Sequence, residues 1–545
     1  MSNAAINTIT IDKADIASGG MKSYKQDDDS IILITRDDST FHAFDGKCPH
    51  AGANLGDGLR CGNRVICPWH HATFDSSDGS LLEPLATEGL TQYQITDNGD
   101  SLTVDTSVKI NKPIEADKLA GTHTIIVGGG GAGFMTAHQL RNTGYGGKIT
   151  LVNAEDKAPY NRPLLSKAFL AGSMPEEKLL LGGADWASKH DIELRLNQTV
   201  SELLPNERSI VIKDESGKDD KQTADFLVVA TGAEPKIPPI KGATLDGVYT
   251  LRSMDDAKLI KAASHDQRVV IVGTGFIGME VASALAQSGT TASITVIGQD
   301  HRVMGNIVSE TVSNALIKLH KENGIEFVFN ASVSEITAAK DTTNNNEENF
   351  SQVKGVILAN GEQIDADIVI LGTGVAPRIE ILQDTNHPDG VQVDEHLQLR
   401  DGVYALGDIA KAPSKLGRMR IEHWRVALQH GMVTAAAILN DDSVNSLAER
   451  IPFFWTMQYG KSLRYSGHAA TPDHGVLLGS PDSFNYIEYY FDDEGEDTRA
   501  SAASSLGRDK ELVAFSELLR QGHAPTRAQI NAGFDIIEQA QVLSR

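Results

Sequence analysis

Two short motifs, Cys48-Pro-His50 and Cys67-Pro-Trp-His70, carry residue types that bind iron or zinc. Sixteen residues lie between His50 and Cys67, and each motif pairs one Cys with one His. This order suits a [2Fe–2S] cluster in which two thiolates hold one iron and two imidazoles hold the other. A Cys2His2 zinc site uses the same ligand types, but it usually has a Cys pair followed by a His pair. The mixed pairs therefore favour the iron–sulfur cluster.

The sequence around both motifs resembles the cluster loops of soluble Rieske domains. The first loop reads Cys48-Pro-His-Ala-Gly-Ala-Asn-Leu-Gly-Asp-Gly, and the second reads Cys67-Pro-Trp-His-His-Ala-Thr-Phe-Asp. The resemblance implies that Cys48, His50, Cys67 and His70 are the ligands. Imidazole in place of thiolate makes such a cluster accept an electron more readily. His71 stands where many relatives have Gly, so we expect a decoy ligand or a polar neighbour that tunes the cluster.

Cysteine usage and charge narrow the class of protein. The third cysteine, Cys61, is the one Cys outside the two motifs, so the sequence offers no disulfide framework and we expect a small apolar residue or a free thiol in a reducing compartment. Lys and Arg total 49 against 73 Asp and Glu, a net charge of −24. This balance argues against nucleic acid or an anionic membrane as a partner. No apolar run suits a membrane span, and no signal peptide or clear mitochondrial presequence is recognisable, so we expect a cytoplasmic protein with mitochondria as the alternative.

A glycine-rich motif follows the apolar segment at residues 125–127 and opens a helical stretch. The residues of this motif that we expect to bind a nucleotide are Gly128, Gly130, Gly131, Ala132 and Gly133. Glycine permits a tight turn and lets backbone N–H groups approach a pyrophosphate at the helix N-terminus. The next strand ends near Glu155, an acid that can hold a ribose hydroxyl, with Asp156 as the close alternative.

The same pattern recurs later in the chain, with Gly273, Gly275 and Gly278. The second strand of this unit is followed by Gln299, where an NAD-binding site usually has Glu or Asp. Gln299 can hydrogen-bond the ribose, but the missing acid also removes repulsion against a 2′-phosphate, and Arg302 could pair with one. Two nucleotide sites in one chain imply FAD at the first and NADH or NADPH at the second, because hydride must pass between two cofactors.

Further segments resemble the FAD-dependent ferredoxin reductases of oxygenase systems and the apoptosis-inducing factor-like proteins. These segments are Ala158-Pro-Tyr-Asn-Arg-Pro-Leu-Leu-Ser-Lys, Ala230-Thr-Gly-Ala-Glu-Pro, Gly372-Thr-Gly-Val-Ala-Pro, Val403-Tyr-Ala-Leu-Gly-Asp and Arg420-Ile-Glu-His-Trp. The segment that begins Pro452-Phe-Phe-Trp-Thr-Met-Gln is most similar to the subgroup with an N-terminal Rieske domain.

The resemblance implies roles for individual residues. Arg162 should hold the flavin nucleotide, and Lys167 should lie near the reactive edge of the flavin, paired with Glu280. A cation there favours the reduced, anionic flavin, whereas an ordinary exposed ion pair is the alternative. Trp455 should cover the ring, lie on the electron exit path, or pack in a core. The remaining expected FAD contacts are Ala230, Thr231, Gly232, Asp408, His423 and Trp424.

These observations predict a multidomain fold: an N-terminal all-β Rieske domain, two Rossmann-like α/β dinucleotide-binding domains and a C-terminal α+β domain. The predicted ranges are 1–108 for the Rieske domain, 109–121 for a linker, 122–255 and 366–450 for the FAD-binding domain, 256–365 for the inserted NAD(P)-binding domain, and 451–545 for the C-terminal reductase domain. Residues 341–349 are predicted to form an exposed loop. Thr526 and Gln529 form a capping box that is predicted to start the last helix.

The predicted activity is an NAD(P)H-dependent oxidoreductase that passes electrons through FAD to its own [2Fe–2S] cluster and then to an external acceptor. The acceptor, a protein or a small molecule, and the oligomeric state are left open. A redox-responsive signalling or interaction protein similar to apoptosis-inducing factor is the alternative. A flavin disulfide reductase is excluded, because it needs a redox Cys pair near the flavin and only Cys61 lies outside the ligand set.

Overall fold

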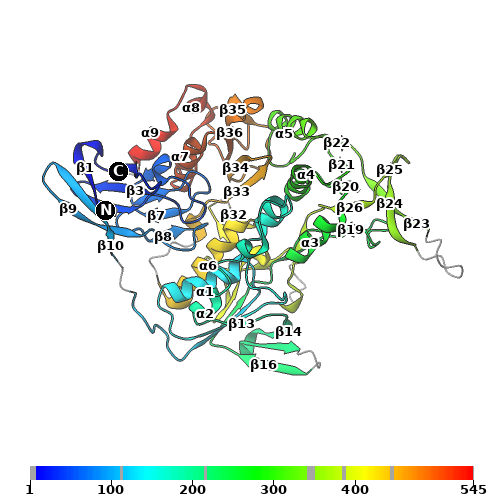
Figure 1. Ribbon diagram of the computed structural model, residues 1–545, viewed down its shortest axis with the longest axis horizontal. Helices are drawn as coiled ribbons and strands as arrows, with labels where there is room; N and C mark the ends of the chain where they lie inside the picture. The colour runs from blue at the N-terminus through cyan, green and yellow to red at the C-terminus, as the bar shows by residue number, and fades with distance from the viewer. Residues whose placement is uncertain are drawn as a thin grey trace, which may run out of the picture.

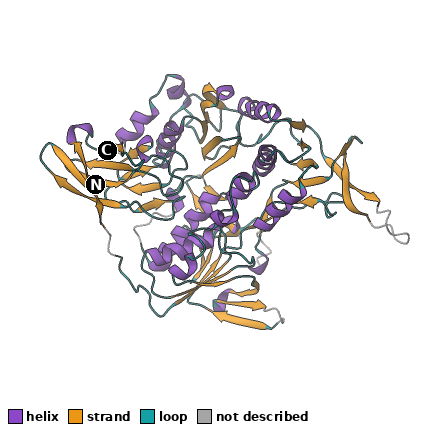
Figure 2. Cartoon of the chain, in the orientation of Figure 1, coloured by secondary structure: helices purple, strands orange, loops and turns teal. Residues whose placement is uncertain are grey.

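A computed structural model describes residues 8–110, 114–213, 218–340, 350–382, 388–415, 417–441 and 447–543. Figure 1 shows the N-terminal strands beside the C-terminal helices, with the α/β units on the other side of the molecule. Figure 2 shows that strands dominate the N-terminal part, whereas helices and strands alternate through the middle of the chain. This architecture agrees with the prediction. The loop predicted at residues 341–349 lies outside the described residues.

The N-terminal unit is built from two antiparallel sheets, as expected for a small β sandwich. The larger sheet has the order β1-β10-β9-β4-β3-β2 and contains β1 (Thr8–Asp12), β2 (Met21–Lys25), β3 (Ile31–Asp37), β4 (Thr40–Asp45), β9 (Gln92–Asp97) and β10 (Ser101–Ile110). The smaller sheet contains β5 (Leu59–Cys61), β6 (Arg64–Ile66), β7 (Thr73–Asp75) and β8 (Leu81–Glu83). The first cluster motif follows β4, and the second lies between β6 and β7. Strand β10 extends two residues into the segment predicted as a linker.

The first α/β unit has a sheet of order β13-β12-β11-β17-β30-β29, in which only the β29–β30 pair is antiparallel among the described pairings. Its strands are β11 (His123–Val127), β12 (Lys148–Val152), β13 (Glu193–Arg195), β17 (Phe226–Val229), β29 (Gln398–Arg400) and β30 (Val403–Ala405). Helix α1 (Gly131–Asn142) packs against α6 (Trp424–Leu439), and the short α2 (Trp186–Lys189) lies nearby (Figure 1). The antiparallel strands β14 (Thr199–Leu204) and β15 (Ser209–Lys213) share the same hydrophobic core, and β16 (Asp219–Thr223) pairs with β15. Parallel strands that are buried on both faces of a sheet have nearly continuous apolar sequences.

The second α/β unit has a parallel sheet of order β19-β26-β20-β21-β22. Its strands are β19 (Val248–Tyr249), β20 (Arg268–Val272), β21 (Ser293–Ile297), β22 (Ile325–Val328) and β26 (Ile368–Leu371), and its helices are α3 (Met254–Ala263), α4 (Phe276–Ser288) and α5 (Glu310–Glu322). A further sheet contains β23 (Val333–Lys340), β24 (Phe350–Leu358) and β25 (Gln363–Asp365). Strands β18 (Ala233–Pro235) and β27 (Val375–Pro377) pair where the chain enters and leaves this unit.

The C-terminal unit packs three helices on an antiparallel sheet of order β33-β34-β37-β36-β35. Its elements are β33 (Phe453–Gln458), β34 (Lys461–Gly467), β35 (Gly475–Ser480), β36 (Asn485–Tyr490), β37 (Ala502–Leu506), α7 (Asp509–Arg520), α8 (Arg527–Asn531) and α9 (Ile536–Leu543). The capping box of Thr526 and Gln529 is present and starts α8. The prediction that α8 is the last helix is wrong, because Gly533 adopts a φ of 80° and the chain turns there into α9.

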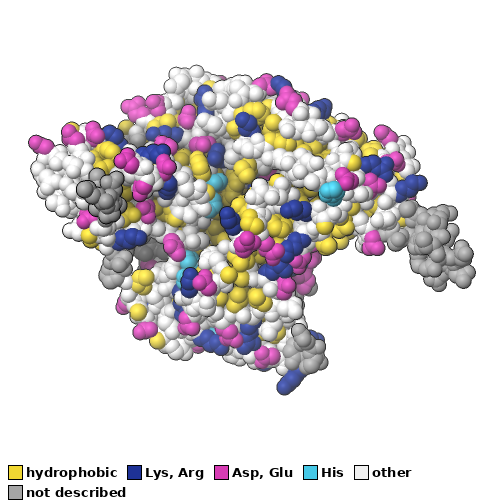
Figure 3. Space-filling view, viewed as in Figure 1, with side chains coloured by type: hydrophobic (Ala, Val, Ile, Leu, Met, Phe, Trp, Pro, Cys, Tyr) yellow, Lys and Arg dark blue, Asp and Glu magenta, His cyan; other side chains and the backbone are white. Residues whose placement is uncertain are grey.

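A small sheet of β28 (Val391–Gln392), β31 (Ala410–Ser414) and β32 (Gly417–Arg420) completes the fold. Acidic and basic side chains are interspersed over the face of the molecule drawn in Figure 3, and hydrophobic side chains gather along its middle. Among the described residues, no helix combines the length and the apolar character needed to cross a membrane.

Candidate functional site

A cavity of about 780 Å³ lies where the two α/β units meet the C-terminal unit. The predicted site residues that line it are Gly130, Gly131, Ala132, Arg162, Lys167, Ala230, Gly232, Gly275, Glu280, Asp408, His423, Trp424 and Trp455. The predicted site residues outside its lining are Gly128, Gly133, Glu155, Thr231, Gly273, Gly278 and Gln299. The fold therefore brings both glycine motifs and the Lys167–Glu280 pair to one hollow.

The first glycine motif forms a tight turn between β11 and α1. Gly128 has a φ of +112°, and a Cβ on Gly133 would lie 2.0 Å from the Gly128 carbonyl oxygen. Gly131 is equally restricted, because a Cβ there would lie 2.8 Å from the Trp424 ring. A Cβ on Gly130 would instead meet none of the described atoms within 4 Å. Gly130 thus leaves open the space next to the α1 N-terminus, as the approach of a pyrophosphate requires.

The second glycine motif repeats this geometry between β20 and α4. Gly273 has a φ of +121°, and a Cβ on Gly278 would lie 2.1 Å from the Gly273 carbonyl oxygen. A Cβ on Gly275 would meet none of the described atoms within 4 Å, and no described side chain caps α4. The open helix N-terminus fits a second dinucleotide. Gln299 is exposed and lies two residues after the end of β21.

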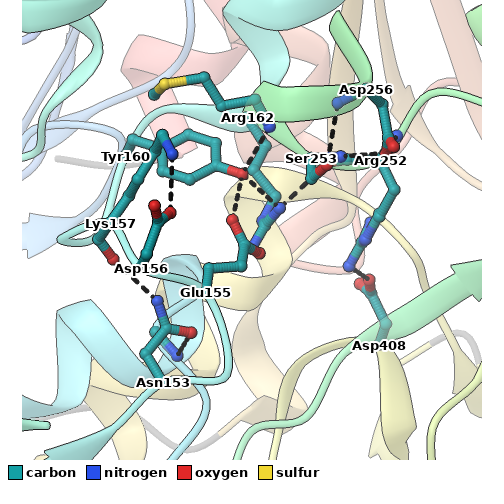
Figure 4. Close-up of polar contacts among 12 residues, drawn as sticks. Asn153, Glu155, Asp156, Lys157, Tyr160, Arg162, Arg252, Ser253, Asp256 and Asp408 are labelled. Carbon is teal, nitrogen blue, oxygen red and sulfur yellow. Dashed lines mark hydrogen bonds and ion pairs between the residues drawn. The ribbon is translucent and has the colours of Figure 1, made fainter. Parts of the chain in front are cut away.

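Glu155 and Arg162 form an ion pair beside the first glycine motif (Figure 4). The Tyr160 hydroxyl donates to Glu155 Oε2 at 2.6 Å, and Arg162 Nη1 donates to the Tyr160 hydroxyl at 2.8 Å. The alternative acid, Asp156, is paired with Lys157 at 2.7 Å. Arg162 lines the cavity whereas Glu155 does not, so Glu155 orients the arginine in this structure.

Asp408 forms an ion pair with Arg252, a residue that was not predicted to belong to the site. Arg252 Nη2 donates to Asp408 Oδ2 at 3.1 Å, and both side chains line the cavity (Figure 4). Gly232 lies against this pair, since a Cβ there would approach Arg252 Nη2 to 2.9 Å. Thr231 faces elsewhere, because its hydroxyl donates to the Arg378 carbonyl oxygen at 2.6 Å.

Lys167 and Glu280 form a buried ion pair at the cavity, with Lys167 Nζ 2.6 Å from Glu280 Oε2. Their side chains are 7% and 4% exposed, which rules out the ordinary exposed pair. Ser166 Oγ donates to Glu280 Oε2 at 2.5 Å, and Thr456 Oγ1 donates to Glu280 Oε1 at 2.8 Å. Lys167 interrupts the helical backbone of the π-helical turn at Leu165–Phe169, a device common at functional sites. The carboxylate is satisfied and holds the ammonium at the cavity wall.

The four predicted cluster ligands converge at the edge of the N-terminal unit. The His50 and His70 rings lie edge to face with centroids 4.9 Å apart, and the Cys48 and Cys67 thiols are hydrogen-bonded to each other. Both Nδ1 atoms are buried and meet no hydrogen-bond partner in the described part of the chain. Burial lowers the pKa of His50 to about 4 and that of His70 to about 2, so both rings are neutral, the form that binds a metal.

This donor set fits a binuclear cluster better than a single zinc ion. In the described ranges, no group of three or more His, Cys, Asp or Glu side chains could hold one metal ion together. A tetrahedral zinc site needs four ligands around one point. A [2Fe–2S] cluster needs only two protein ligands on each iron. The unpaired Nδ1 atoms and the paired thiols therefore suit the predicted cluster.

His71 occupies a backbone position that favours glycine. His71 N donates to the Cys67 carbonyl oxygen, and in the first cluster loop Gly52 N donates in the same way to the Cys48 carbonyl oxygen. His71 and Gly52 both have a positive φ, of 57° and 78° respectively. The His71 ring packs on Phe453, with centroids 4.2 Å apart, and burial holds its pKa well below the usual value. His71 is therefore a packed neighbour of the predicted ligands in this structure.

Cys61 is buried in the core shared with the C-terminal unit, as expected of a small apolar residue.

Trp455 joins the cavity to the cluster loops. Its indole lines the cavity and packs on the His70 ring, with centroids 4.8 Å apart. The sequence analysis missed two further aromatic residues of the lining, Phe276 and Phe454, whose rings meet edge to face at 4.7 Å. The one sequence signal for these two residues is the apolar character of the motif around Phe276, which is compatible with a place in the cavity wall.

A buried charge network fastens the N-terminal unit to the rest of the chain, and it also escaped the sequence analysis. Arg64 Nη2 lies 2.7 Å from Glu83 Oε1, and Arg425 Nη2 of α6 lies 2.7 Å from Glu83 Oε2. Arg64 Nε also reaches Glu517 Oε1 of α7 at 3.2 Å. Burial opposes the charge of Glu83, but Arg425 and Arg64 outweigh it and hold the pKa of Glu83 well below its usual range. Three units thus share one set of paired charges.

Comparison with protein families divides the chain into three matching regions. Residues 122–431 match the family model described as Pyridine nucleotide-disulphide oxidoreductase. Residues 8–94 match the Rieske [2Fe-2S] domain, and residues 453–536 match the model described as Reductase C-terminal.

Similar proteins cover most of the chain. Apoptosis-inducing factor 3 of Homo sapiens is 28% identical over 519 residues, which are 92% of this chain and 82% of that protein. Rhodocoxin reductase of Rhodococcus erythropolis is 32% identical over 401 residues, which are 72% of this chain and 88% of that protein. The solved ferredoxin reductase for the CYP199A2 system from Rhodopseudomonas palustris has a TM-score of 0.69 at 28% identity, covering 77% of this chain and 100% of that one. The covalent putidaredoxin reductase–putidaredoxin complex also gives 0.69, at 26% identity, over 78% of this chain and 99% of that one.

Proposed function

Because this chain belongs to the pyridine nucleotide-disulphide oxidoreductase family and carries a Rieske [2Fe-2S] domain, we propose that it passes electrons from NAD(P)H through FAD to its own cluster. The cluster then serves an external one-electron acceptor. Membership confirms the predicted resemblance, the fold class, the NAD(P)H oxidoreductase activity and the cofactors FAD, [2Fe–2S] and NAD(P)H. Bound FAD accepts two electrons as hydride and releases them singly, and the cluster carries one at a time.

The observation that carries the proposal is the contact between His70 and Trp455. Trp455 touches the ring of a predicted cluster ligand and also lines the cavity that holds both glycine motifs. One aromatic side chain therefore spans the wall between the predicted flavin site and the predicted cluster. A Rieske domain that served only a separate reductase would have no need of this contact within its own chain.

The buried network around Glu83 supports the same route. It ties the N-terminal unit to α6 and α7 through paired charges that are shielded from water. A shifted interface would leave one of these charges buried without its partner, which is costly, so the network favours one docked arrangement of the N-terminal unit. Joining donor and acceptor in one chain also raises their effective concentration, and docking adds a defined geometry.

We assign the residue roles on the same basis. Lys167, held by Glu280, places a cation at the cavity wall, where it stabilises negative charge that develops on reduction. The proposed FAD contacts are Gly128, Gly130, Gly131, Ala132, Gly133, Arg162, Ala230, Gly232, Asp408 and Trp424. Thr231, whose hydroxyl is engaged by the Arg378 carbonyl oxygen, and Glu155 are proposed to support this site without touching FAD. Gly273, Gly275, Gly278 and Gln299 are proposed for the nicotinamide dinucleotide. Glu155 acts by orienting Arg162, since its carboxylate is engaged by Tyr160 and Arg162.

Anaerobic reduction of the holoprotein with NADH tests the route. Flavin absorbance should fall first, and the electron paramagnetic resonance signal of the reduced cluster should follow without any added carrier. Cys48→Ser should lose the cluster signal while flavin reduction continues, and Cys61→Ser is the matched control that should keep both. A cluster that stays oxidised after complete flavin reduction would refute the intramolecular route. Acceptors that lose their reduction in Cys48→Ser are served through the cluster.

A further inference from the structure

Arg302 lies next to the second glycine motif, on the segment that follows β21. Met304 N of this segment donates to the Thr274 carbonyl oxygen at 2.9 Å, within the glycine turn. Gly298 packs on the same residue, since a Cβ there would lie 2.5 Å from Thr274 Cγ2. The end of this strand is where dinucleotide-binding folds read the adenosine ribose, and a nearby Arg there accommodates a 2′-phosphate. Arg302 therefore stands where it could select NADPH.

The guanidinium of Arg302 is already paired with an acid from a different unit. Arg302 Nη1 donates to Asp473 Oδ1 at 2.8 Å, and Nη2 lies 3.5 Å from Asp473 Oδ2. Asp473 belongs to the segment between β34 and β35 of the C-terminal unit. The Arg302 side chain is only 12% exposed, whereas Asp473 is 56% exposed. The pair lowers the pKa of Asp473, so the carboxylate is ionised and faces the solvent side of the site.

Most of the described charged groups around Arg302 are acidic, and the nearby His474 is itself paired with Glu494 at 3.4 Å. Asp300 acts on Arg302 as a second negative charge, and it is paired with His301 at 2.6 Å. Gln299 is neutral, so it can hydrogen-bond a ribose hydroxyl without rejecting a phosphate. A 2′-phosphate arriving here would have to displace Asp473 from Arg302 and would meet the carboxylates of Asp473, Asp300 and Glu310.

We propose that Asp473 makes the second dinucleotide site select NADH over NADPH by occupying Arg302. The proposal rests on the function proposed above and names its electron donor. The selectivity for NADH comes from the carboxylate of Asp473 in the C-terminal unit, which takes the place of the acid that NAD-binding sites usually have after the strand equivalent to β21. Removing the charge of Asp473 leaves Arg302 with only a neutral amide acceptor, which a phosphate can displace from the donor fork.

The test compares kcat/KM for NADH and NADPH in the holoprotein, with ferricyanide as the acceptor. Wild type should prefer NADH, and Asp473→Asn should raise the NADPH-to-NADH ratio by about tenfold or more, the effect of one charge-assisted hydrogen bond. The double variant Asp473→Asn with Arg302→Gln should return the ratio to the wild-type range. Asp482→Asn is the matched control, because Asp482 also pairs across the same units, with Lys318 at 3.5 Å, and its ratio should stay at the wild-type value.

Three outcomes would overturn the proposal: a wild-type preference for NADPH, an unchanged ratio in Asp473→Asn, or a raised ratio that persists in the double variant. Inhibition by adenosine 2′,5′-bisphosphate relative to adenosine 5′-monophosphate gives a second measurement. Asp473→Asn should tighten binding of the bisphosphate selectively, and equal tightening of both would count against the proposal. Failure of wild type to oxidise either nucleotide would instead refute the proposed function, which separates the two results.

Discussion

The imidazole of His70 packs on the indole of Trp455, with the ring centroids 4.8 Å apart. The two rings come from different units, a cluster loop and strand β33, and Trp455 also lines the cavity. The proposed route from flavin to cluster within one chain rests on this contact.

Trp455→Leu should slow transfer from the flavin to the cluster while leaving flavin reduction by NADH near the wild-type rate. The aliphatic side chain removes the aromatic contact with His70 but preserves apolar packing. We expect a loss of roughly tenfold, equivalent to about 1.4 kcal/mol in barrier height. Anaerobic stopped-flow spectroscopy resolves the two phases. Trp69→Leu is the matched control, because Trp69 is 40% exposed and adjoins His70 in sequence without lining the cavity; equal slowing in both variants would argue against a specific route.

Glu83→Gln should destabilise docking of the N-terminal unit. Arg425 would remain buried with a neutral partner and Arg64 would keep only Glu517, and breaking a buried pair costs about 3–5 kcal/mol. We expect a lower melting temperature and faster proteolysis near residues 109–121, both read on the holoprotein. Glu88→Gln, an exposed change in the same unit, should leave both values at wild type. Wild-type behaviour of Glu83→Gln would show that apolar packing alone holds the unit in place.

Lys167→Met should slow reduction of the flavin by NADH. The change removes the cation that Glu280 holds at the cavity wall, and the loss of one preorganised charged donor costs about 10²-fold in rate. Stopped-flow absorbance at the flavin band measures it, and the flavin redox potential should fall in parallel. The exposed Lys178→Met serves as the control. If the potential is unchanged and only KM rises, Lys167 acts in nucleotide binding instead.

Buried His320 should make stability fall on mild acidification. Its Nε2 lies 2.8 Å from Gln458 Oε1, Tyr459 contacts its other nitrogen, and burial lowers its pKa to about 4. The unfolded chain binds a proton near pH 6.5, so the stability contribution is complete above that pH and is lost as pH falls from 6.5 towards 4. The loss by pH 5 should be about 2 kcal/mol.

Melting temperatures between pH 7.5 and 5 check this expectation. His320→Gln should show a shallower decrease than wild type, whereas the exposed His396→Gln should follow the wild-type curve. If the melting temperature falls equally with pH in wild type and His320→Gln, other buried histidines, such as His138, cause the loss of stability in acid.

Features encoded within one stretch of sequence were predicted well. The glycine turns at Gly128 and Gly273 depend on backbone conformations that few other residues adopt, so the spacing of the glycines is enough to predict the turns. The capping box at Thr526 also formed as predicted. The prediction that this helix is the last one was wrong, because nothing local to Thr526 specifies that the chain turns at Gly533 into α9.

The sequence by itself determined the chemistry of the chain: the two Cys and two His of a cluster, two glycine motifs at helix N-termini, and the overall order of the domains. These features depend on residue type and local spacing. Only the tertiary structure decided how the parts are connected. Glu83 meets Arg425 across 342 positions and Arg302 meets Asp473 across 171, because separate hydrophobic cores pack together and then select which polar side chains must be paired at their borders. That packing places Trp455 against His70 and an acid on Arg302, and neither contact is visible in any single segment.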